Sequence, residues 1–229
     1  MDEKRFWIDF VEGRISVPEM LERTEAEPAL LDWLTKIADP KFKTTVSKIE
    51  IDEDGDKNYI HFDQPFDAKL QIYAYVYAGF AGGKLGRYLN VHGYFSRILT
   101  TAFPEEGIVV DQTLEDQFHF MLDACPSYIG GPEVDHLLDE LLETLPEGLS
   151  KTKRAKLYKE KVKELFGIQD KKYPRWVQEA EWPIAPSGKP MRFVEQKRAR
   201  GKEYAMSLLT HYIFEDPDTG EQRVVDQFT

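Results

Sequence analysis

The chain has 229 residues, of which 41% are hydrophobic and 13% aromatic, enough apolar side chains to bury a core as one large domain or as a domain with a subdomain. It contains 30 Lys and Arg against 41 Asp and Glu, a formal net charge of −11 at pH 7. Because phosphate groups are bound mainly by clustered Lys and Arg, this balance argues against binding to nucleic acid or to an anionic membrane, and it favours a basic protein partner.

The first 40 residues have the spacing of short amphipathic helices. Apolar side chains four residues apart predict a helix over residues 4–12, which Gly13 ends. Ser16 and Glu19 form a capping box that starts a second helix, running to about Thr24. A third apolar stripe follows Pro28 and ends at Pro40.

The next segment changes to an alternating pattern. Residues 45–51 and 58–62 are rich in β-branched and aromatic side chains, and an acidic segment with Gly55 joins them, which predicts a β-hairpin. Residues 66–103 are ambiguous, since Tyr73, Tyr75 and Tyr77 alternate as in a strand. We favour two helices there, over about 67–79 and 84–102.

Helical patterns return in residues 113–124, 132–145 and 151–166. From Tyr173 the period becomes two, and residues 191–197, 203–214 and 223–228 predict three strands. The turn before the last strand, residues 217–220, ends in a glycine that can adopt a positive φ.

These elements predict an α+β fold: a mostly helical N-terminal body with a β-hairpin, followed by a C-terminal antiparallel β-meander. We expect the helical body to span residues 1–168, with the hairpin at 45–62. The meander would form a subdomain of residues 172–229, either separate or packed with the body as one domain.

Cellular location is predicted from two features. Cys125 is the single cysteine, so no disulfide can form within the chain, as suits a reducing compartment. The first residues have no apolar secretion core, and the longest uncharged stretch, residues 70–83, is too short to span a bilayer. We therefore expect a cytoplasmic protein that does not enter the membrane.

The charge is distributed in blocks. Between Arg97 and Lys151 lie 53 residues with twelve carboxylates and no Lys or Arg. Residues 151–163 then have seven basic side chains against Glu160 alone. Blocks of this kind create strong local fields that select binding partners.

The acidic block is densest on the helix predicted over residues 132–145. At 100° per residue, leucines occupy one side and acids the other. Like charges four residues apart cost about 0.2–0.5 kcal/mol per pair, and an acid in the last turn opposes the helix dipole, so stability alone does not select this pattern. The candidate partner-binding residues are Glu133, Asp135, Asp139, Glu140 and Glu143.

The sequence predicts no catalytic residues, no metal site and no cofactor. Cys125 follows a helix C-terminus, where the dipole disfavours a thiolate. The acids of residues 52–56 have the wrong spacing for a calcium loop, and residues 79–85 have the wrong spacing for a phosphate loop. A weaker alternative is a hydrolase or metal enzyme that uses His119, Asp123, Asp135 and His136.

One segment, residues 173–228, resembles a known module. It contains Trp182-Pro183, Gly188-Lys189-Pro190, Phe193 and Gln196, in the pattern W-P-x(4)-G-K-P-x-x-F-x-x-Q. This module is similar to one in small bacterial proteins, some YwqG-like and others immunity proteins of polymorphic or contact-dependent toxin systems. The immunity likeness implies a cytoplasmic inhibitor that binds one toxin domain stoichiometrically. The alternative is that these aromatic residues only form the core of the meander.

Two hypotheses follow. In the first, the chain is an immunity-type inhibitor whose acidic helix binds a basic toxin domain such as a nuclease. In the second, it is a structural or regulatory adaptor whose acidic helix pairs internally with the basic helix 151–163. The oligomeric state is not predicted.

Overall fold

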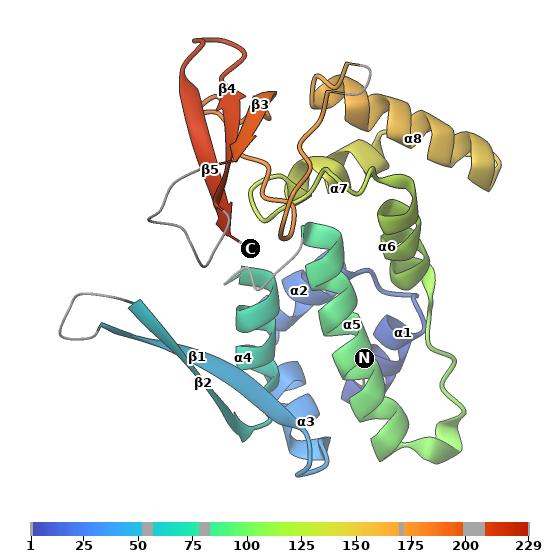
Figure 1. Ribbon diagram of the computed structural model, residues 1–229. Helices are drawn as coiled ribbons and strands as arrows, with labels where there is room; N and C mark the ends of the chain where they lie inside the picture. The colour runs from blue at the N-terminus through green and yellow to red at the C-terminus, as the bar shows by residue number, and fades with distance from the viewer. Residues whose placement is uncertain (1, 52–56, 78–82, 170–171, 199–208, 229) are drawn as a thin grey trace. The chain divides into compact units, whose positions relative to one another are not determined.

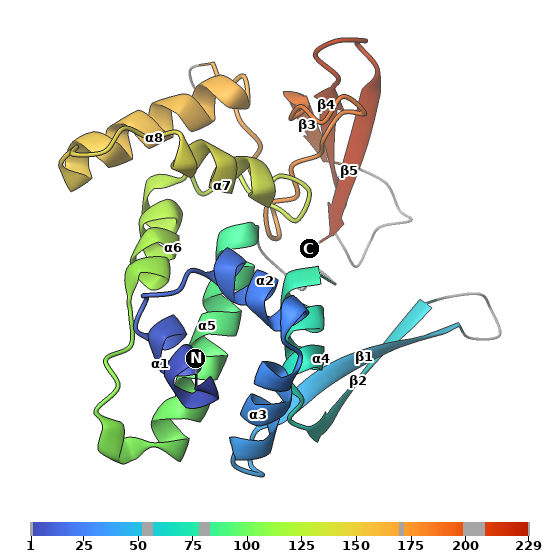
Figure 2. The same cartoon turned by 180° about the vertical axis from the view of Figure 1, so that it is seen from behind.

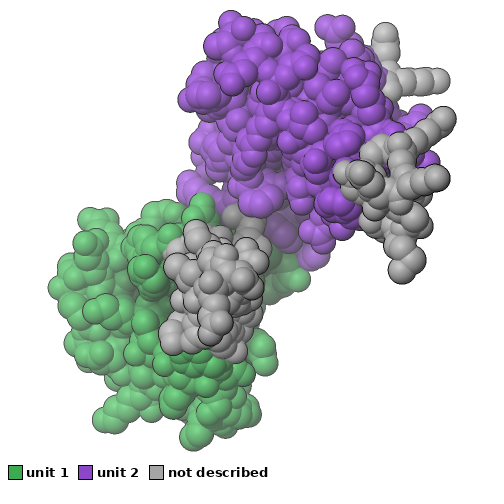
Figure 3. Space-filling view, turned by 60° about the vertical axis from the view of Figure 1, so that its left-hand side comes forward, with its two compact units in different colours: residues 1–81, 85–116 green, residues 82–84, 117–229 purple. Residues whose placement is uncertain are grey.

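The computed structural model describes residues 2–51, 57–77, 83–169, 172–198 and 209–228, with the backbone alone for 46–51 and 57–61. The fold is α+β, as predicted (Figure 1). The chain divides into two compact units, shown in Figure 3: unit 1 comprises residues 1–81 and 85–116, and unit 2 comprises residues 82–84 and 117–229. No helix in the described part of the chain has the length and apolar character needed to cross a bilayer.

Unit 1 contains five α-helices, a two-stranded hairpin, a π-helical turn and a 3-10 turn among its described residues. Their bounds are α1 Glu3–Val11, α2 Val17–Ala26, α3 Ala29–Ile37, β1 Lys43–Ile51, β2 Lys57–Pro65, α4 Ala68–Ile72, the π-helical turn η1 Tyr73–Tyr77, α5 Lys84–Ala102, whose first residue belongs to unit 2, and the 3-10 turn η2 Pro104–Glu106.

The local signals in residues 1–103 are confirmed. The Ser16 hydroxyl accepts a hydrogen bond from the Glu19 amide at 3.3 Å, as the capping box requires. Strands β1 and β2 pair antiparallel, from Lys43 opposite Pro65 to Ile51 opposite Lys57. The ambiguous segment is helical, as favoured from the sequence; its residues 78–82 and the hairpin turn 52–56 lie outside the described residues.

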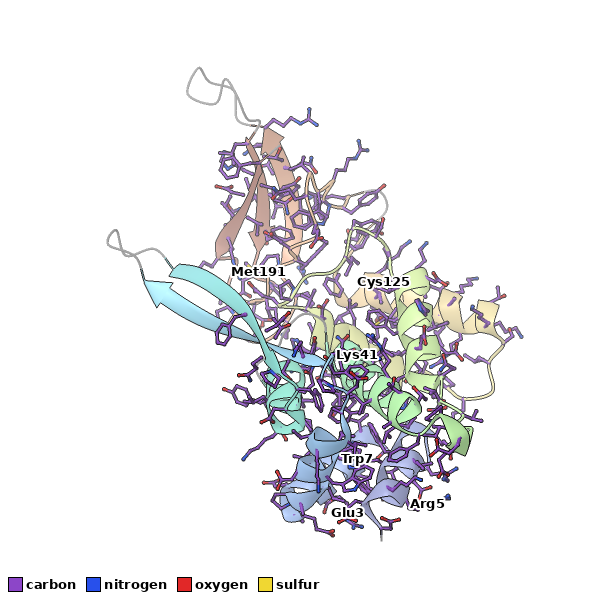
Figure 4. All side chains as sticks on the ribbon, turned by 90° about the horizontal axis from the view of Figure 1, so that it is seen from below. Glu3, Arg5, Trp7, Lys41, Cys125 and Met191 are labelled. Atoms are coloured by element: carbon purple, nitrogen blue, oxygen red, sulfur yellow. The ribbon has the colours of Figure 1, made fainter. Side chains whose placement is uncertain are left out.

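Aromatic side chains fill the core of unit 1. Trp7, labelled in Figure 4, is fully buried, and its indole N–H donates to the Leu30 carbonyl at 3.0 Å. The rings of Phe6 and Phe95 lie edge-on to it, with centroids 5.0 and 5.3 Å away. Trp7 thus joins α1 to α3 and α5, and each such edge-to-face pair adds about 0.5–1.5 kcal/mol beyond area burial.

Unit 2 contains the remaining elements. They are α6 Thr113–Ala124, whose first turn belongs to unit 1, α7 Asp135–Glu143, α8 Lys151–Leu165, β3 Arg192–Arg198, β4 Leu209–Glu215 and β5 Gln222–Phe228. The three strands form the predicted antiparallel meander with β4 in the centre. Gly220, with φ of 74°, lies in the β4–β5 turn where the sequence predicts a glycine with positive φ. The predicted segment 203–208 lies outside the described residues.

The two aromatic residues of the module, Trp182 and Phe193, pack on a common ring in unit 2. Trp182 is buried, and its ring lies edge-on to those of Phe166 and Phe214, with centroids 5.1 and 5.2 Å away. Its indole N–H donates to the carbonyl of Met191 at 2.8 Å. Phe193 packs on the same Phe214 at 5.6 Å. These contacts agree with the plainer interpretation of the module as the core of the meander.

The boundary between the two units differs from the one expected at residues 168–172, and the packing around Trp182 explains the difference. Its backbone N–H donates to the Gly130 carbonyl at 3.0 Å, and its ring contacts Phe166 just after α8. Helices α7 and α8 therefore share a unit with the meander, and the division falls within α6 instead.

His92 in α5 generates a prediction about pH. Burial lowers its pKa below the usual 6.5, against the opposing effects of the Val11 carbonyl, 3.1 Å from its Nε2, and of Asp111. The unfolded chain therefore binds an extra proton below about pH 6.5, so the free energy of unfolding should fall as pH drops, by up to about 1.4 kcal/mol per pH unit from this group. His92→Leu should show a shallower fall between about pH 7 and 5 in urea unfolding. Equal slopes for the two proteins would contradict this role.

Candidate functional site

The buried face of α7 is rotated from the one that the sequence predicted. Leu138 and Leu142 are buried, as expected, but Leu137 and Leu141 are half-exposed. Asp139 is buried, with 4% of its surface exposed, and this corrects the expectation that it faces outward. The acids of α7 therefore lie in two different environments.

Asp139 is buried against a glycine of its own unit. Its carboxylate lies against Gly83, directly before the first residue of α5. A side chain on Gly83 would overlap the Asp139 carboxylate, so the close approach depends on the absence of a Cβ at that position. Asp139 therefore has a structural position within unit 2.

Asp135 lies beside Asp139 at the start of α7 and is half-buried. Burial, and then the charge of Asp139, raise the pKa of its carboxyl group. A carboxylate in this position holds its charge less readily than a solvated one, which makes Asp135 a weak contributor to an outward-facing acidic surface.

Glu133 precedes α7 and is bound to the meander. Its two carboxylate oxygens accept hydrogen bonds from the Arg223 guanidinium at 2.7 and 2.9 Å, and one of them also accepts from the Ile184 N–H at 3.0 Å. The Arg223 hydrogen bonds are the main reason that the pKa of Glu133 is lowered. Its charge is therefore already satisfied within unit 2.

Glu140 and Glu143 lie on the exposed side of α7, with His136 one turn before Glu140. Glu143 forms an ion pair with Lys84 at 3.1 Å, but its side chain remains 65% exposed. Such exposed pairs contribute about 0–1 kcal/mol and exchange readily with other partners. In the described part of the chain, Glu140 forms no ion pair. These two acids form the accessible part of the predicted surface.

Helices α7 and α8 pack through apolar side chains. Tyr158 of α8 is fully buried and its hydroxyl donates to the Leu138 carbonyl at 3.1 Å. Among the described residues, no ion pair joins an acid of α7 to a lysine of α8; Lys156 instead pairs with Glu160 of its own helix at 3.9 Å. The basic helix therefore lies beside the acidic one without neutralising it by direct contact.

The alternative chemical sites are not assembled. No group of three or more His, Cys, Asp or Glu side chains within the described ranges is placed to hold a metal ion, so His119, Asp123, Asp135 and His136 do not converge as the metal-enzyme hypothesis required. Burial, with a smaller contribution from Asp135, raises the pKa of the Cys125 thiol to about 12. A thiol with so high a pKa is a poor nucleophile at neutral pH.

Comparison with known proteins gives no relative: no family model matches the chain, and no curated protein or solved structure is significantly similar to it.

The sequence interpretation missed one surface feature, the outward-facing pair Tyr73 and Tyr77, which are 61% and 63% exposed. Their spacing of four residues was the available signal, but the alternation with Tyr75 obscured it.

Two glycine substitutions should change the free energy of unfolding in opposite directions, one of them because of the position of Asp139. A Cβ on Gly83 would lie 2.7 Å from Asp139 Cγ and 2.8 Å from the Asp135 carbonyl oxygen, so Gly83→Ala should lower the free energy of unfolding by about 1–3 kcal/mol. A Cβ on Gly93, inside α5, would meet no neighbouring side chain or other segment within 4 Å, so Gly93→Ala should raise it by about 0.5–1 kcal/mol. Thermal and urea unfolding measure both changes, and a neutral Gly83→Ala would contradict the close packing of Asp139.

Proposed function

We propose that the chain is an acidic binding protein, an immunity-type inhibitor that neutralises a basic toxin domain by stoichiometric binding. The observation that supports this most directly is that Glu140 and Glu143 remain exposed although a helix with seven basic side chains in residues 151–163 packs against α7. The carboxylates are therefore available to a positively charged partner.

The electrostatics of the whole chain favour the same class of partner. The net charge of −11 favours a basic partner over nucleic acid for the chain as a whole, and because screening limits charge interactions to about 8–10 Å at physiological salt, the local carboxylates determine the attraction at α7. In the proposed complex, Glu140 and Glu143 meet Lys and Arg around the substrate groove of a nuclease-type toxin domain. The carboxylates there occupy the place of substrate phosphates and block substrate entry.

The likeness of residues 173–228 to YwqG-like and immunity-type proteins adds support of a different kind. It concerns the scaffold, since Trp182 and Phe193 both pack against Phe214. The adaptor hypothesis required internal pairing of the acidic helix with residues 151–163, and the described ion pairs provide no such pairing.

A charge-reversal experiment tests the proposal. The probe is the C-terminal domain of the protein encoded by the upstream reading frame, produced separately and mixed with this protein at increasing NaCl. Co-expression of this protein should suppress the toxicity of the probe domain. The rate at which the two proteins associate should fall on the order of tenfold between about 50 and 500 mM salt. Glu140→Lys with Glu143→Lys should weaken binding by about tenfold or more while leaving the fold intact.

The matched control is Glu181→Lys with Glu221→Lys, which makes the same change of net charge at two other exposed positions of unit 2. It should retain most of the affinity and the protection. Equal loss in both double variants would show that only net charge matters and would remove α7 from the interface. A neighbouring domain that is neither toxic nor bound would contradict the immunity function itself.

A further inference from the structure

Unit 1 has an open groove that the acidic helix does not involve. It lies between α2, α3 and the continuous helix formed by α4 and η1, which Figure 2 shows side by side, and has a volume of about 770 Å³. Its apolar lining comes from Leu21, Leu31, Ile72, Tyr73 and Tyr77. All of these residues belong to unit 1.

The two tyrosines are exposed because of the π-helical turn. Within η1, Ala74 is buried, and Tyr75 and Val76 pack against the core. Tyr73 and Tyr77 are left pointing away from it, with more than half of each side chain exposed. The carbonyl of Val76 accepts a hydrogen bond from Arg87 Nη1 at 3.1 Å, which supports the turn. Single π-helical turns occur frequently at functional sites.

The walls of the groove are fixed before any ligand arrives. The Ala68 N–H donates to the Thr35 hydroxyl at 3.0 Å, which joins α4 to α3. The Asp67 carboxylate caps α4 by accepting from the Leu70 N–H at 3.0 Å. Ile72 and Leu31 form a buried floor. Preformed walls reduce the entropy lost on binding.

Charged side chains surround the apolar floor. Glu25 and Asp32 line one side of the groove against Lys69 on the other, and all three are exposed. The excess of acid extends to the whole unit, which contains twelve Lys and Arg against 22 Asp and Glu, whereas unit 2 is close to neutral. A ligand with cationic groups at its edges therefore complements the groove.

We propose that this groove binds a basic amphipathic segment of another protein. Apolar side chains of the segment pack on Ile72, Tyr73 and Tyr77, and its Lys or Arg side chains meet Glu25 and Asp32. Exposed tyrosines are typical anchors of protein interfaces, and Arg can also stack on their rings. A second copy of this chain is disfavoured as the occupant because unit 1 repels itself at a net charge of −10. The proposal is independent of the α7 surface.

A designed peptide pair tests the groove directly. The probe is a fluorescein-labelled amphipathic helix of Leu and Lys, and its partner has Glu in place of each Lys. Fluorescence anisotropy should detect saturable 1:1 binding of the Lys peptide, weakened by salt, and no binding of the Glu peptide. Tyr73→Ala with Tyr77→Ala should raise Kd at least about tenfold, and Asp32→Lys should raise it several-fold.

Three controls separate this site from general attraction to an acidic protein. Phe228→Ala removes an exposed aromatic ring of unit 2, and Glu105→Lys reverses an exposed charge of unit 1 outside the groove; both should bind as the wild type does. Glu140→Lys with Glu143→Lys should also bind normally, since that surface is separate. Unchanged Kd in the tyrosine and Asp32 variants would overturn the proposal. Concentration-dependent dimers that the tyrosine substitutions abolish would make a second copy the occupant and would also overturn it.

Discussion

The buried hydrogen bond from the Tyr158 hydroxyl to the Leu138 carbonyl determines how the charged helices of unit 2 meet. Burial raises the pKa of this phenol far above its usual value, so it donates as a neutral group throughout the physiological range. Tyr158 and Val162 are the buried side chains of α8, whereas Lys151, Lys153, Lys156 and Lys159 are exposed. An acidic and a basic helix therefore pack together through apolar contact, and their charges remain available to other partners.

The acids in and just before α7 lie in different environments. Asp139 is buried against Gly83, and Asp135 beside it is half-buried. Glu133 is bound to Arg223 of the meander and helps join it to the helices. Only Glu140 and Glu143 remain on the outer side. Of the five acids that the sequence places on one face, Asp135 and Asp139 are thus at least half-buried, Glu133 is bound to the meander, and Glu140 and Glu143 are exposed.

Local patterns in the sequence were sufficient for most elements. The Ser16 cap, the β1–β2 hairpin and the meander follow from hydrogen bonds or periodicities within a few residues. The burial of Asp139 did not follow, because it depends on Gly83, which is 56 positions away in the chain. The grouping of α7 and α8 with the meander depends likewise on Trp182 meeting Phe166 and Gly130. Contacts between distant segments overrode the pattern at these positions, and at Tyr73 a π-helical turn changed which side chains face outward.

Neutralising the basic helix tests directly whether α7 and α8 are held together by apolar contact and leave their charges free. A variant with glutamine at Lys151, Lys153, Lys156 and Lys159 removes four exposed charges and leaves Tyr158 in place. Its melting temperature should lie within about 2 °C of the wild type, because the ion pair lost is the exposed Lys156–Glu160 contact. A melting temperature lower than that of the wild type by about 5 °C or more, with a difference that shrinks at high salt, would show that the two helices neutralise each other. That result would contradict packing through apolar contact alone.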